Sequence, residues 1–420
     1  MSFKKIFLIA IIICVCGSLV TKNIIDIIKS DDEYSFRKAI KLQNEDGGII
    51  YINTTVLNIK TDSAIELRGD LPGTIIGIQQ PNNQYPIINF ETARNNGSFK
   101  SLYLYGSNKV LQYLIIENSG THGIQVYGKN HILDHIISRY NQYAGIYIDN
   151  LANTNTFNYI YSYRNCDIKG NGINGDGFFI NGAMNNYFNY CFSWDNSNNG
   201  FGVSKLELQN SIMSYSNCAC WNNGNADVFS GKYDYKNGAP LDKKMLTIQQ
   251  LIKSDQNYEK NYIEKKFNID NSLIDGKEAY NWISITNSKT KGNGFQFGFA
   301  LSVDPVTIKR VCEYSVAFDH KSIGFDNNYS KKYNGYFSNC VSFNNKINYK
   351  LPYNFEKWSN NWSWGATEAD QSDMNQNLEK PNNEYTQEMF YTIRNQIVDA
   401  VNANTFEDSF NFNRIIISLY

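Results

Sequence analysis

Cys191-Phe192-Ser193-Trp194-Asp195-Asn196 is the stretch that decides the fold, because a close copy, Cys218-Ala219-Cys220-Trp221-Asn222-Asn223, follows 27 residues later. Weaker copies with the same order of apolar, small and polar residues begin at Leu114, Ile136, Ile160, Ser315 and Cys340. Most copies are followed within a few residues by Gly and an apolar residue, as in Gly200-Phe201. A repeat of short units with a period in the twenties is typical of a solenoid.

The spacing and the alternation of this repeat predict strands. The third residues of successive copies are at positions 116, 138, 162, 193 and 220, which are 22, 24, 31 and 27 residues apart. Side chains alternate with a period of two, as in Ile124-Gln125-Val126, and there is neither a helical period nor a leucine-rich consensus here. We therefore predict an all-β chain folded as a parallel β-helix of roughly eight to ten coils, stacked about 4.8 Å apart.

Two columns of equivalent residues have predictable roles in such a stack. The first column is apolar and includes three cysteines, which we expect to be inward, stacked and reduced, because a free cysteine packs as a small apolar residue: Cys191, Cys218 and Cys340. The last column predicts a ladder of amide hydrogen bonds along the axis, with sugar contact as the alternative role: Asn165, Asn196, Asn223 and Asn345.

The N-terminus has the pattern of a signal peptide over residues 1–18. Lys4 and Lys5 precede an apolar run over 6–16, which is too short to span a bilayer, and small residues follow it. An uncleaved N-terminal anchor and a lipid on Cys14 or Cys16 are the alternatives. We expect a protein that is secreted, or held at the cell surface or in the periplasm.

The remaining chain divides into three parts. Residues 19–104 predict an N-terminal cap and the first coils, with a helix that starts near residues 30–33 and ends at Gly47-Gly48. Residues 105–350 hold the repeats, interrupted by a charged insertion over 225–280 in which 245–251 is a candidate short helix. Residues 351–420 predict a C-terminal cap or tail, with an amphipathic helix from Met389 to Val401 that covers the last coil or packs along the side.

Three motifs resemble polysaccharide lyase family nine, whose members are calcium-dependent pectate lyases. Asn174-Gly175-Asp176-Gly177-Phe178 is similar to the family's N-A-D-G-F, and the stretch 194–202 is similar to W-x-N-S-D-D-G-W-D. Gly292-Asn293-Gly294-Phe295-Gln296-Phe297-Gly298 is similar to G-N-G-F-K-L-G. The motifs stand in the family's order. The resemblance covers about residues 35–350 and implies a right-handed parallel β-helix with a polysaccharide as its partner.

The resemblance also implies a site. In the family, several carboxylates hold a calcium ion that acidifies the C5 proton of a uronate, and a lysine removes that proton. Asp176 keeps the first carboxylate, whereas Asn198 and Asn199 replace the adjacent pair and Gly202 replaces the fourth. We expect calcium to bind weakly or not at all, through Asp176 and Asp195 helped by Asn198 and Asn199, and we expect no other cofactor.

The catalytic lysine falls on Gln296, which cannot accept a proton as a general base. A relocated base is one alternative, with Lys321 preferred over Lys205, Lys291 and Lys309, although a solvated surface lysine is the commoner role. The sequence therefore predicts a pectate lyase-like protein that acts on or binds acidic polysaccharide of the pectin or uronate type, with lost or weak β-elimination. Substrate contacts are expected from Asp176, Asn198, Asn199 and Gln296.

Other functions leave weaker signals. A non-catalytic glycan-binding or surface β-helix protein is the main alternative; for it, the cluster Trp358, Trp362 and Trp364 is either a sugar platform or a hydrophobic plug. A polygalacturonase would need clustered aspartates and the Gly-His-Gly that is missing here. His131 and His135 are a weak metal candidate. A net charge of −1 speaks against nucleic acid, and we expect no nucleotide and a monomer.

Overall fold

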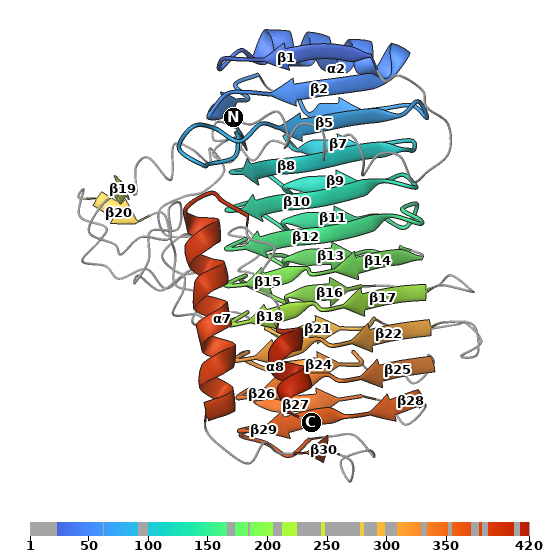
Figure 1. Cartoon of the computed structure of the whole chain (residues 1–420), viewed down its shortest axis with the longest axis vertical. Coiled ribbons are helices and arrows are strands. Elements are labelled where there is room, and N and C mark those ends of the chain that lie inside the picture. The colour runs from blue at the N-terminus through green and yellow to red at the C-terminus, as the bar shows by residue number, and fades with distance from the viewer. Residues whose placement is uncertain are drawn as a thin grey trace.

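The chain folds into a parallel β-helix whose coils are stacked along one long axis (Figure 1). The computed structural model describes residues 23–61, 63–90, 100–165, 173–183, 185–204, 212–224, 245–247, 278–280, 292–298, 309–328, 334–351, 355–370, 378–379, 385–406 and 412–419. Within these residues no helix is long and apolar enough to cross a membrane.

One face of the stack is a nine-stranded parallel sheet, to which each coil contributes one short strand. Its strands, in spatial order, are β4 (Ile65–Leu67), β7 (Leu102–Leu104), β9 (Ile124–Val126), β11 (Ile146–Ile148), β13 (Phe178–Ile180), β16 (Phe201–Val203), β21 (Phe295–Gln296), β24 (Ile323–Asp326) and β27 (Ile347–Lys350). Nine coils among the described residues agree with the eight to ten that the repeat predicts.

The rest of the stack is a larger sheet of nineteen strands. They are β1 (Ile24–Ile28), β2 (Gly48–Ile52), β3 (Val56–Asn58), β5 (Gly73–Gly77), β6 (Ile87–Asn89), β8 (Lys109–Glu117), β10 (Ile132–Arg139), β12 (Thr156–Tyr163), β14 (Asn186–Asn189), β15 (Phe192–Trp194), β17 (Ile212–Ser216), β18 (Ala219–Trp221), β22 (Lys309–Glu313), β23 (Val316–Phe318), β25 (Asn334–Ser338), β26 (Val341–Phe343), β28 (Phe355–Ser359), β29 (Asn361–Trp364) and β30 (Leu378–Glu379). The coils therefore extend on both sides of the predicted repeat region 105–350.

Inside the coils, equivalent side chains stack on one another. Along the nine-stranded sheet the rings of Phe178, Phe201, Phe295 and Phe325 follow each other with centroids 4.5, 4.7 and 5.0 Å apart. All four rings are fully buried. Parallel strands at this spacing bring like residues together, so the rings stack as one column in the interior.

The predicted asparagine ladder is present and buried. The Nδ2 of Asn165 donates to Oδ1 of Asn196 at 2.9 Å, and the Nδ2 of Asn196 donates to Oδ1 of Asn223 at 3.0 Å. His320 takes the next place, where its Nδ1 accepts from the backbone N–H of Asn223 and its own N–H donates to Oδ1 of Asn345. Burial lowers the pKa of His320 to about 3, so the ring is neutral and can accept this hydrogen bond. The asparagine column therefore has the structural role of a buried hydrogen-bond ladder.

The residue before each ladder position has a left-handed backbone conformation. Asn118, Tyr140, Arg164, Asp195, Asn222, Asp319 and Asn344 have φ between 52° and 60°. The strained turn aims the next side chain inward to the ladder, and the buried amide bonds over-determine the conformation.

The cysteines of the first column are inward and unbridged, as predicted. Cys191, Cys218 and Cys340 are buried and free, and so are Cys220 and Cys312. Cys166 lies outside the described residues.

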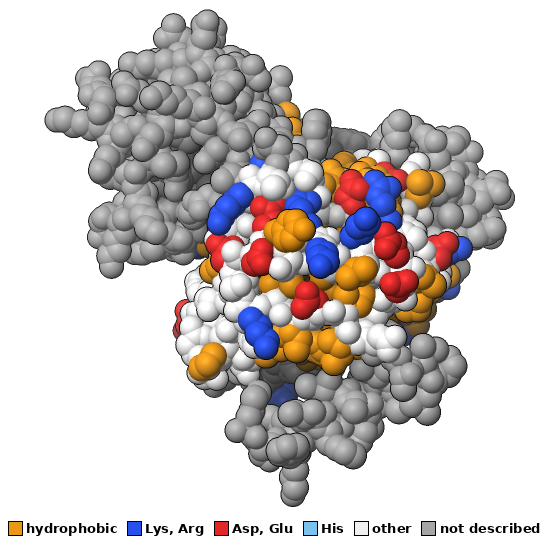
Figure 2. Space-filling view, turned by 90° about the horizontal axis from the view of Figure 1, so that it is seen from above, with side chains coloured by type: hydrophobic (Ala, Val, Ile, Leu, Met, Phe, Trp, Pro, Cys, Tyr) orange, Lys and Arg blue, Asp and Glu red, His pale blue; other side chains and the backbone are white. Residues whose placement is uncertain are grey.

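The N-terminal cap is the helix α2 (Glu33–Asp46). Asp32 accepts at its Oδ1 from the backbone N–H of Ser35, and Gly47 ends the helix with φ 72°. Phe36, Ala39 and Ile40 are buried over the first coil. Seen from this end, the cap shows intermingled acidic and basic side chains (Figure 2). The mixed charges disfavour edge-to-edge association at the end of the stack.

The C-terminal helices pack along the side of the stack. The helix α7 (Tyr385–Asn402) runs beside the coils and α8 (Asn413–Ser418) lies next to it (Figure 1). They bury Phe390, Ile397 and Val401 against an outward apolar face of the nineteen-stranded sheet. Of the two arrangements expected for the C-terminal helix, packing along the side is confirmed.

The insertion over 225–280 lies mostly outside the described residues. Within it, β19 (Met245–Thr247) pairs antiparallel with β20 (Glu278–Tyr280). The short helix expected over 245–251 is therefore wrong for residues 245–247. The backbone there gains its hydrogen bonds from a neighbouring strand.

Replacing Asn196 with alanine should destabilise the stack. The substitution leaves the buried partners Asn165 and Asn223 without their amide contacts, so we expect the free energy of unfolding to fall by about 3 kcal/mol. Chemical denaturation followed by circular dichroism measures it. The control is Asn189→Ala, whose amide bonds only the half-buried Asn158, with an expected loss under about 1 kcal/mol. Equal losses in both variants would contradict the ladder's role.

The thiols should be reduced and slow to react in the folded protein. Burial raises the pKa of Cys191, Cys220 and Cys312 well above the ordinary value, so little thiolate forms at pH 8. In a thiol assay we expect slow labelling of the native protein and rapid labelling of at least five thiols after denaturation without reductant. Bridged cysteines would stay unlabelled in both states.

Candidate functional site

The three sequence motifs meet on the outward face of the nine-stranded sheet. Phe179 is the register partner of Gly202, and Gln296 is the partner of Asp326, which in turn pairs with Lys350. Because Phe201 pairs with Phe295, Gly202 and Gln296 are also neighbours. These outward residues form one line along the stack, which we call the floor column: Tyr103, Gln125, Tyr147, Phe179, Gly202, Gln296, Asp326 and Lys350.

Asp176 lies at the turn that leads into β13, and its carboxylate lies next to Gly202 of the floor column. Its Oδ1 accepts from the backbone N–H of Asn199 at 2.8 Å and from Nδ2 of Asn198 at 2.9 Å. A Cβ placed on Gly202 would lie 3.0 Å from the Asp176 carboxylate. The structure thus brings together the four positions that resemble the family's carboxylates, Asp176, Asn198, Asn199 and Gly202.

A second amide–carboxylate pair repeats this arrangement further along the stack. The Oδ1 of Asn199 accepts from the backbone N–H of Asn293 at 3.1 Å, and the Nδ2 of Asn293 donates to Oδ2 of Asp326 at 2.9 Å. Asp176 and Asp326 are buried, with 2% and 4% of their surfaces exposed. A chain of hydrogen bonds through Asn199 and Asn293 therefore links the two carboxylates.

Gln296 lies on β21 between Gly202 and Asp326, where the family resemblance implies the base. Gln296 is buried, with 6% of its surface exposed. Lys321 lies elsewhere, in the turn between β23 and β24. This turn is next to Gly292, where an added Cβ would lie 2.9 Å from the Cβ of Lys321. Burial lowers the pKa of Lys321, which is the direction that a general base requires. However, the strand neighbours of Gln296 are Gly202 and Asp326, not Lys321. The role of Lys321 as a substitute base stays a prediction.

Asp195 is not part of this cluster. It occupies the left-handed turn before the ladder, where Oδ2 lies 3.5 Å from Arg164 Nε and Oδ1 accepts from Asn222 Nδ2 at 2.7 Å. Burial raises the pKa of Asp195, although Arg164 opposes the shift. Its partners belong to the turns beside α7, so Asp195 stabilises turns and does not fit the expected role of metal ligand beside Asp176.

The residues at the family's calcium positions do not fit that ion well. A calcium site requires several hard anionic oxygens around one point, and Asp176 supplies the single carboxylate of the four positions. Asn198 turns its amide nitrogen toward Asp176, and the carbonyl oxygen of Asn199 accepts from Asn293. Among the described residues no group of three or more His, Cys, Asp or Glu side chains could hold a metal.

Sequence reasoning missed the aromatic part of the floor column and the pair Asp326 and Lys350. Tyr103, Tyr105 and Tyr127 stack with ring centroids 5.0 to 6.0 Å apart, and Arg68 lies 4.7 Å over Tyr105. Tyr147 and Phe179 continue the series with centroids 5.7 Å apart. A signal was available, because six of the eight floor residues, all except Tyr103 and Lys350, directly follow the apolar residue of a Gly-apolar pair. That these side chains point outward on one sheet became clear only from the register.

Other candidates have structural roles. His131 accepts a backbone hydrogen bond from Lys109, and His135 stacks between Tyr113 and Tyr159. The three tryptophans pack on the last coils, as in Trp364 against Phe343 at 4.6 Å, which agrees with the plug interpretation.

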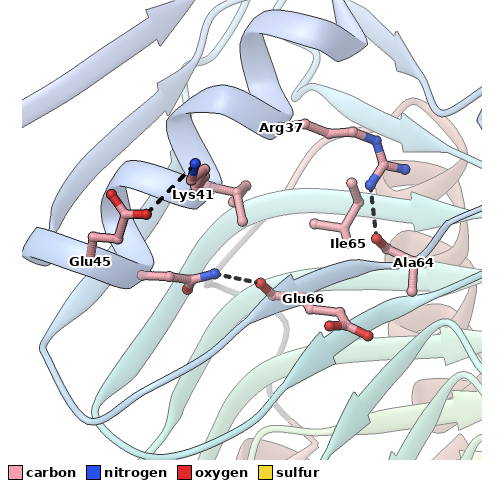
Figure 3. A pocket seen from close by; sticks show the side chains of 8 residues that line it. Arg37, Lys41, Glu45, Ala64, Ile65 and Glu66 are labelled. Atoms are coloured by element: carbon pink, nitrogen blue, oxygen red, sulfur yellow. Dashed lines mark hydrogen bonds and ion pairs between the residues drawn. The ribbon is translucent and has the colours of Figure 1, made fainter.

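A pocket between α2 and β4 holds its polar groups in cap contacts (Figure 3). Arg37 donates to the backbone oxygen of Ala64, Asn44 donates to that of Glu66, and Lys41 pairs with Glu45. The bonds of Arg37 and Asn44 attach the cap helix to the first coils, so the polar groups of this pocket have a structural role.

The parallel β-helix fold is shared with known proteins. The crystal structure of pectate lyase Pel9A is similar with a TM-score of 0.60 and 18% identity, over 93% of this chain and 89% of that one. A rhamnogalacturonan lyase structure has a TM-score of 0.49 and 15% identity, over 86% and 88% of the two chains. No curated protein matches the sequence. The family model described as the Pel9A-like, right handed beta helix region matches residues 29–239. That match spans 211 of the 420 residues, and the chain belongs to the Pel9A-like family of right-handed parallel β-helices.

Proposed function

We propose that this protein is exported, binds polysaccharide along the floor column, and cleaves polygalacturonate poorly or not at all. The observation that carries the proposal is Gln296, which stands on the floor where the family resemblance implies a lysine, with Gly202 and Asp326 as its neighbours. A glutamine amide donates and accepts hydrogen bonds but is no base. Loss of a general base typically lowers a rate by about 10²–10⁴-fold.

The polysaccharide part rests on the family and on the floor column. The Pel9A neighbour is a pectate lyase by its title, and the floor combines carboxylates, amides and aromatic rings on one face. Such a mixture suits a ligand with many hydroxyl groups and apolar ring faces. Acidic polysaccharide of the pectin type is the first ligand to test.

A relocated base is the competing possibility. Lys350 shares the floor column with Gln296 and is two strands away, about 9.6 Å at the usual strand spacing. A general base must lie within hydrogen-bond reach of the proton that it removes, so a base on Lys350 would act two strands away from the position that the family resemblance implies. Lys321 lies in a turn outside the column.

Hydrolysis is disfavoured by the same network. Asp326 belongs to the floor column and Asp176 lies beside it, and both accept hydrogen bonds from N–H groups. The donors are Asn198 Nδ2 and the backbone N–H of Asn199 for Asp176, and Asn293 Nδ2 and the backbone N–H of Asn328 for Asp326. A glycosidase needs one carboxyl group that gives a proton to the leaving oxygen. Both aspartates are instead arranged as acceptors.

The activity test uses the mature protein with polygalacturonate and calcium. β-Elimination leaves a C4–C5 double bond that absorbs near 235 nm (a property of the product). We expect little or no product from the natural sequence and a measurable rate from Gln296→Lys. Gln125→Lys places the same lysine on the same column four strands away and is the matched control. Rapid product formation by the natural sequence would defeat the proposal.

The calcium test is a calorimetric titration. We expect affinity weaker than micromolar for the natural sequence, because charge count tunes calcium affinity. The double substitution Asn198→Asp with Asn199→Asp should bind more tightly. The control is Asn158→Asp with Asn189→Asp, which adds the same charge on the other sheet. Submicromolar affinity of the natural sequence that is lost in Asp176→Ala would overturn the expectation.

A further inference from the structure

Histidine takes the place of asparagine at one position of the ladder that contains Asn196. In this ladder the Oδ1 of Asn196 accepts a hydrogen bond from the backbone N–H of Asn165 at 3.1 Å. In the coil of β23 and β24 the Nδ1 of His320 makes the same bond, because it accepts from the backbone N–H of Asn223 at 3.2 Å. An amide oxygen accepts throughout the ordinary pH range, whereas the Nδ1 of imidazole accepts only while the ring is neutral.

A second ladder, at the start of β10, β12 and β14, has the same substitution. The backbone N–H of Asn155 donates to the Oδ1 of Asn186, and that of His131 donates to the Oδ1 of Asn155. One coil earlier, the backbone N–H of Lys109 donates to the Nδ1 of His131 at 3.1 Å. Both His131 and His320 are buried. Two separate ladders therefore each include one histidine that must be neutral to bind the neighbouring coil.

The groups that face the two rings favour the neutral form. Burial lowers the pKa of His131 to about 4, and the nearby ammonium group of Lys109 acts in the same direction. Burial lowers the pKa of His320 to about 3, although its Nε2 lies 3.2 Å from the backbone oxygen of Cys220. The Cys220 thiol stays neutral in acid, because burial raises its pKa. Among the described residues, no carboxylate contributes to either shift.

We propose that His131 and His320 are acid-sensitive joints of the stack, at which protonation of the ring releases the backbone of the neighbouring coil. An imidazolium has an N–H group on each nitrogen, so its Nδ1 would meet the backbone N–H of Lys109 or Asn223 as donor against donor. An asparagine at either position would keep its acceptor in acid. The His320 joint adjoins the candidate site, because a Cβ added at Gly294, directly before β21, would lie 2.7 Å from the Nε2 of His320.

The direction of the pH dependence follows from proton binding. In the unfolded chain a histidine binds a proton below pH about 6.5, whereas in the folded protein these two rings bind one only below about 4 and about 3. The stability that each neutral ring contributes is therefore complete above pH about 6.5, and it is lost as the pH falls from there toward the pKa of the folded state. Between pH 7.5 and pH 5, each histidine should raise the equilibrium constant of unfolding about thirtyfold relative to an asparagine.

The test is chemical denaturation of the full chain at pH 7.5 and at pH 5. In His131→Asn and in His320→Asn, we expect the change in the unfolding constant between the two pH values to be about thirtyfold smaller than in the natural sequence. Carboxylates contribute equally to all of these proteins and cancel in the comparison. The control Tyr187→His adds an exposed histidine on β14 and should leave the pH dependence unchanged. If both asparagine variants stay within about threefold of the natural pH dependence, the proposal is wrong.

A second measurement needs no variant, so it holds even where a substituted chain does not fold. The chain has four histidines, and their NMR signals can be followed in the natural protein from pH 8 to pH 5 after isotope labelling of histidine. We expect at least two signals to remain those of a neutral ring with its proton on Nε2 for as long as the protein is folded. Titration of all four signals near pH 6.5 in the folded protein would show that the rings gain protons without opening the stack, and would overturn the proposal.

Discussion

The stacking of each coil on the next, at the spacing of parallel strands, is the constraint on which the rest of this structure depends. Each strand residue has its equivalent one coil away, so each strand position of the repeat becomes a column. Inward columns are filled by rings, cysteines and the asparagine ladder, while outward columns bear the surface chemistry. The floor column is one of these lines, and its members come from positions as distant in sequence as Phe179 and Lys350.

The two sheets use their outward faces differently. The larger sheet bears an apolar face that is buried under α7 and α8, where Phe318 and Phe343 meet Tyr391. The Tyr391 hydroxyl donates to Asp319 in a turn of the stack, so the helix is attached by polar contacts as well as by apolar packing. The nine-stranded sheet instead bears aromatic, amide and charged side chains along the floor column.

Separation of inward and outward columns allows surface residues to vary while the fold of the family is kept. The stability of the stack comes from buried rings and amides that point inward. Gly202 and Gln296 point outward, so their substitution leaves those contacts intact. At the positions that resemble the family's carboxylates, the side-chain amide of Asn198 and the backbone N–H of Asn199 donate to the carboxylate of Asp176. The hydrogen-bonding needs of a buried carboxylate are thereby met by the protein itself.

The sequence by itself determined the repeat, and with it the columns. The recurrence of Cys191 to Asn196 sufficed to predict the parallel coils, the inward cysteines and the ladder, because a period-two strand pattern fixes which residues face inward. It also placed Asp176, Asn198, Asn199 and Gln296 in one cluster, by resemblance. Coil lengths vary, however, so the exact register across turns was hidden, and Asp326, Lys350 and Phe179 were missed. Only the tertiary structure decided that Asp195 pairs with Arg164 and that His320 takes the place of an asparagine in the ladder. It also decided that α7 lies along the side of the stack. Each of these depends on contacts between residues far apart in the chain, which no local pattern encodes.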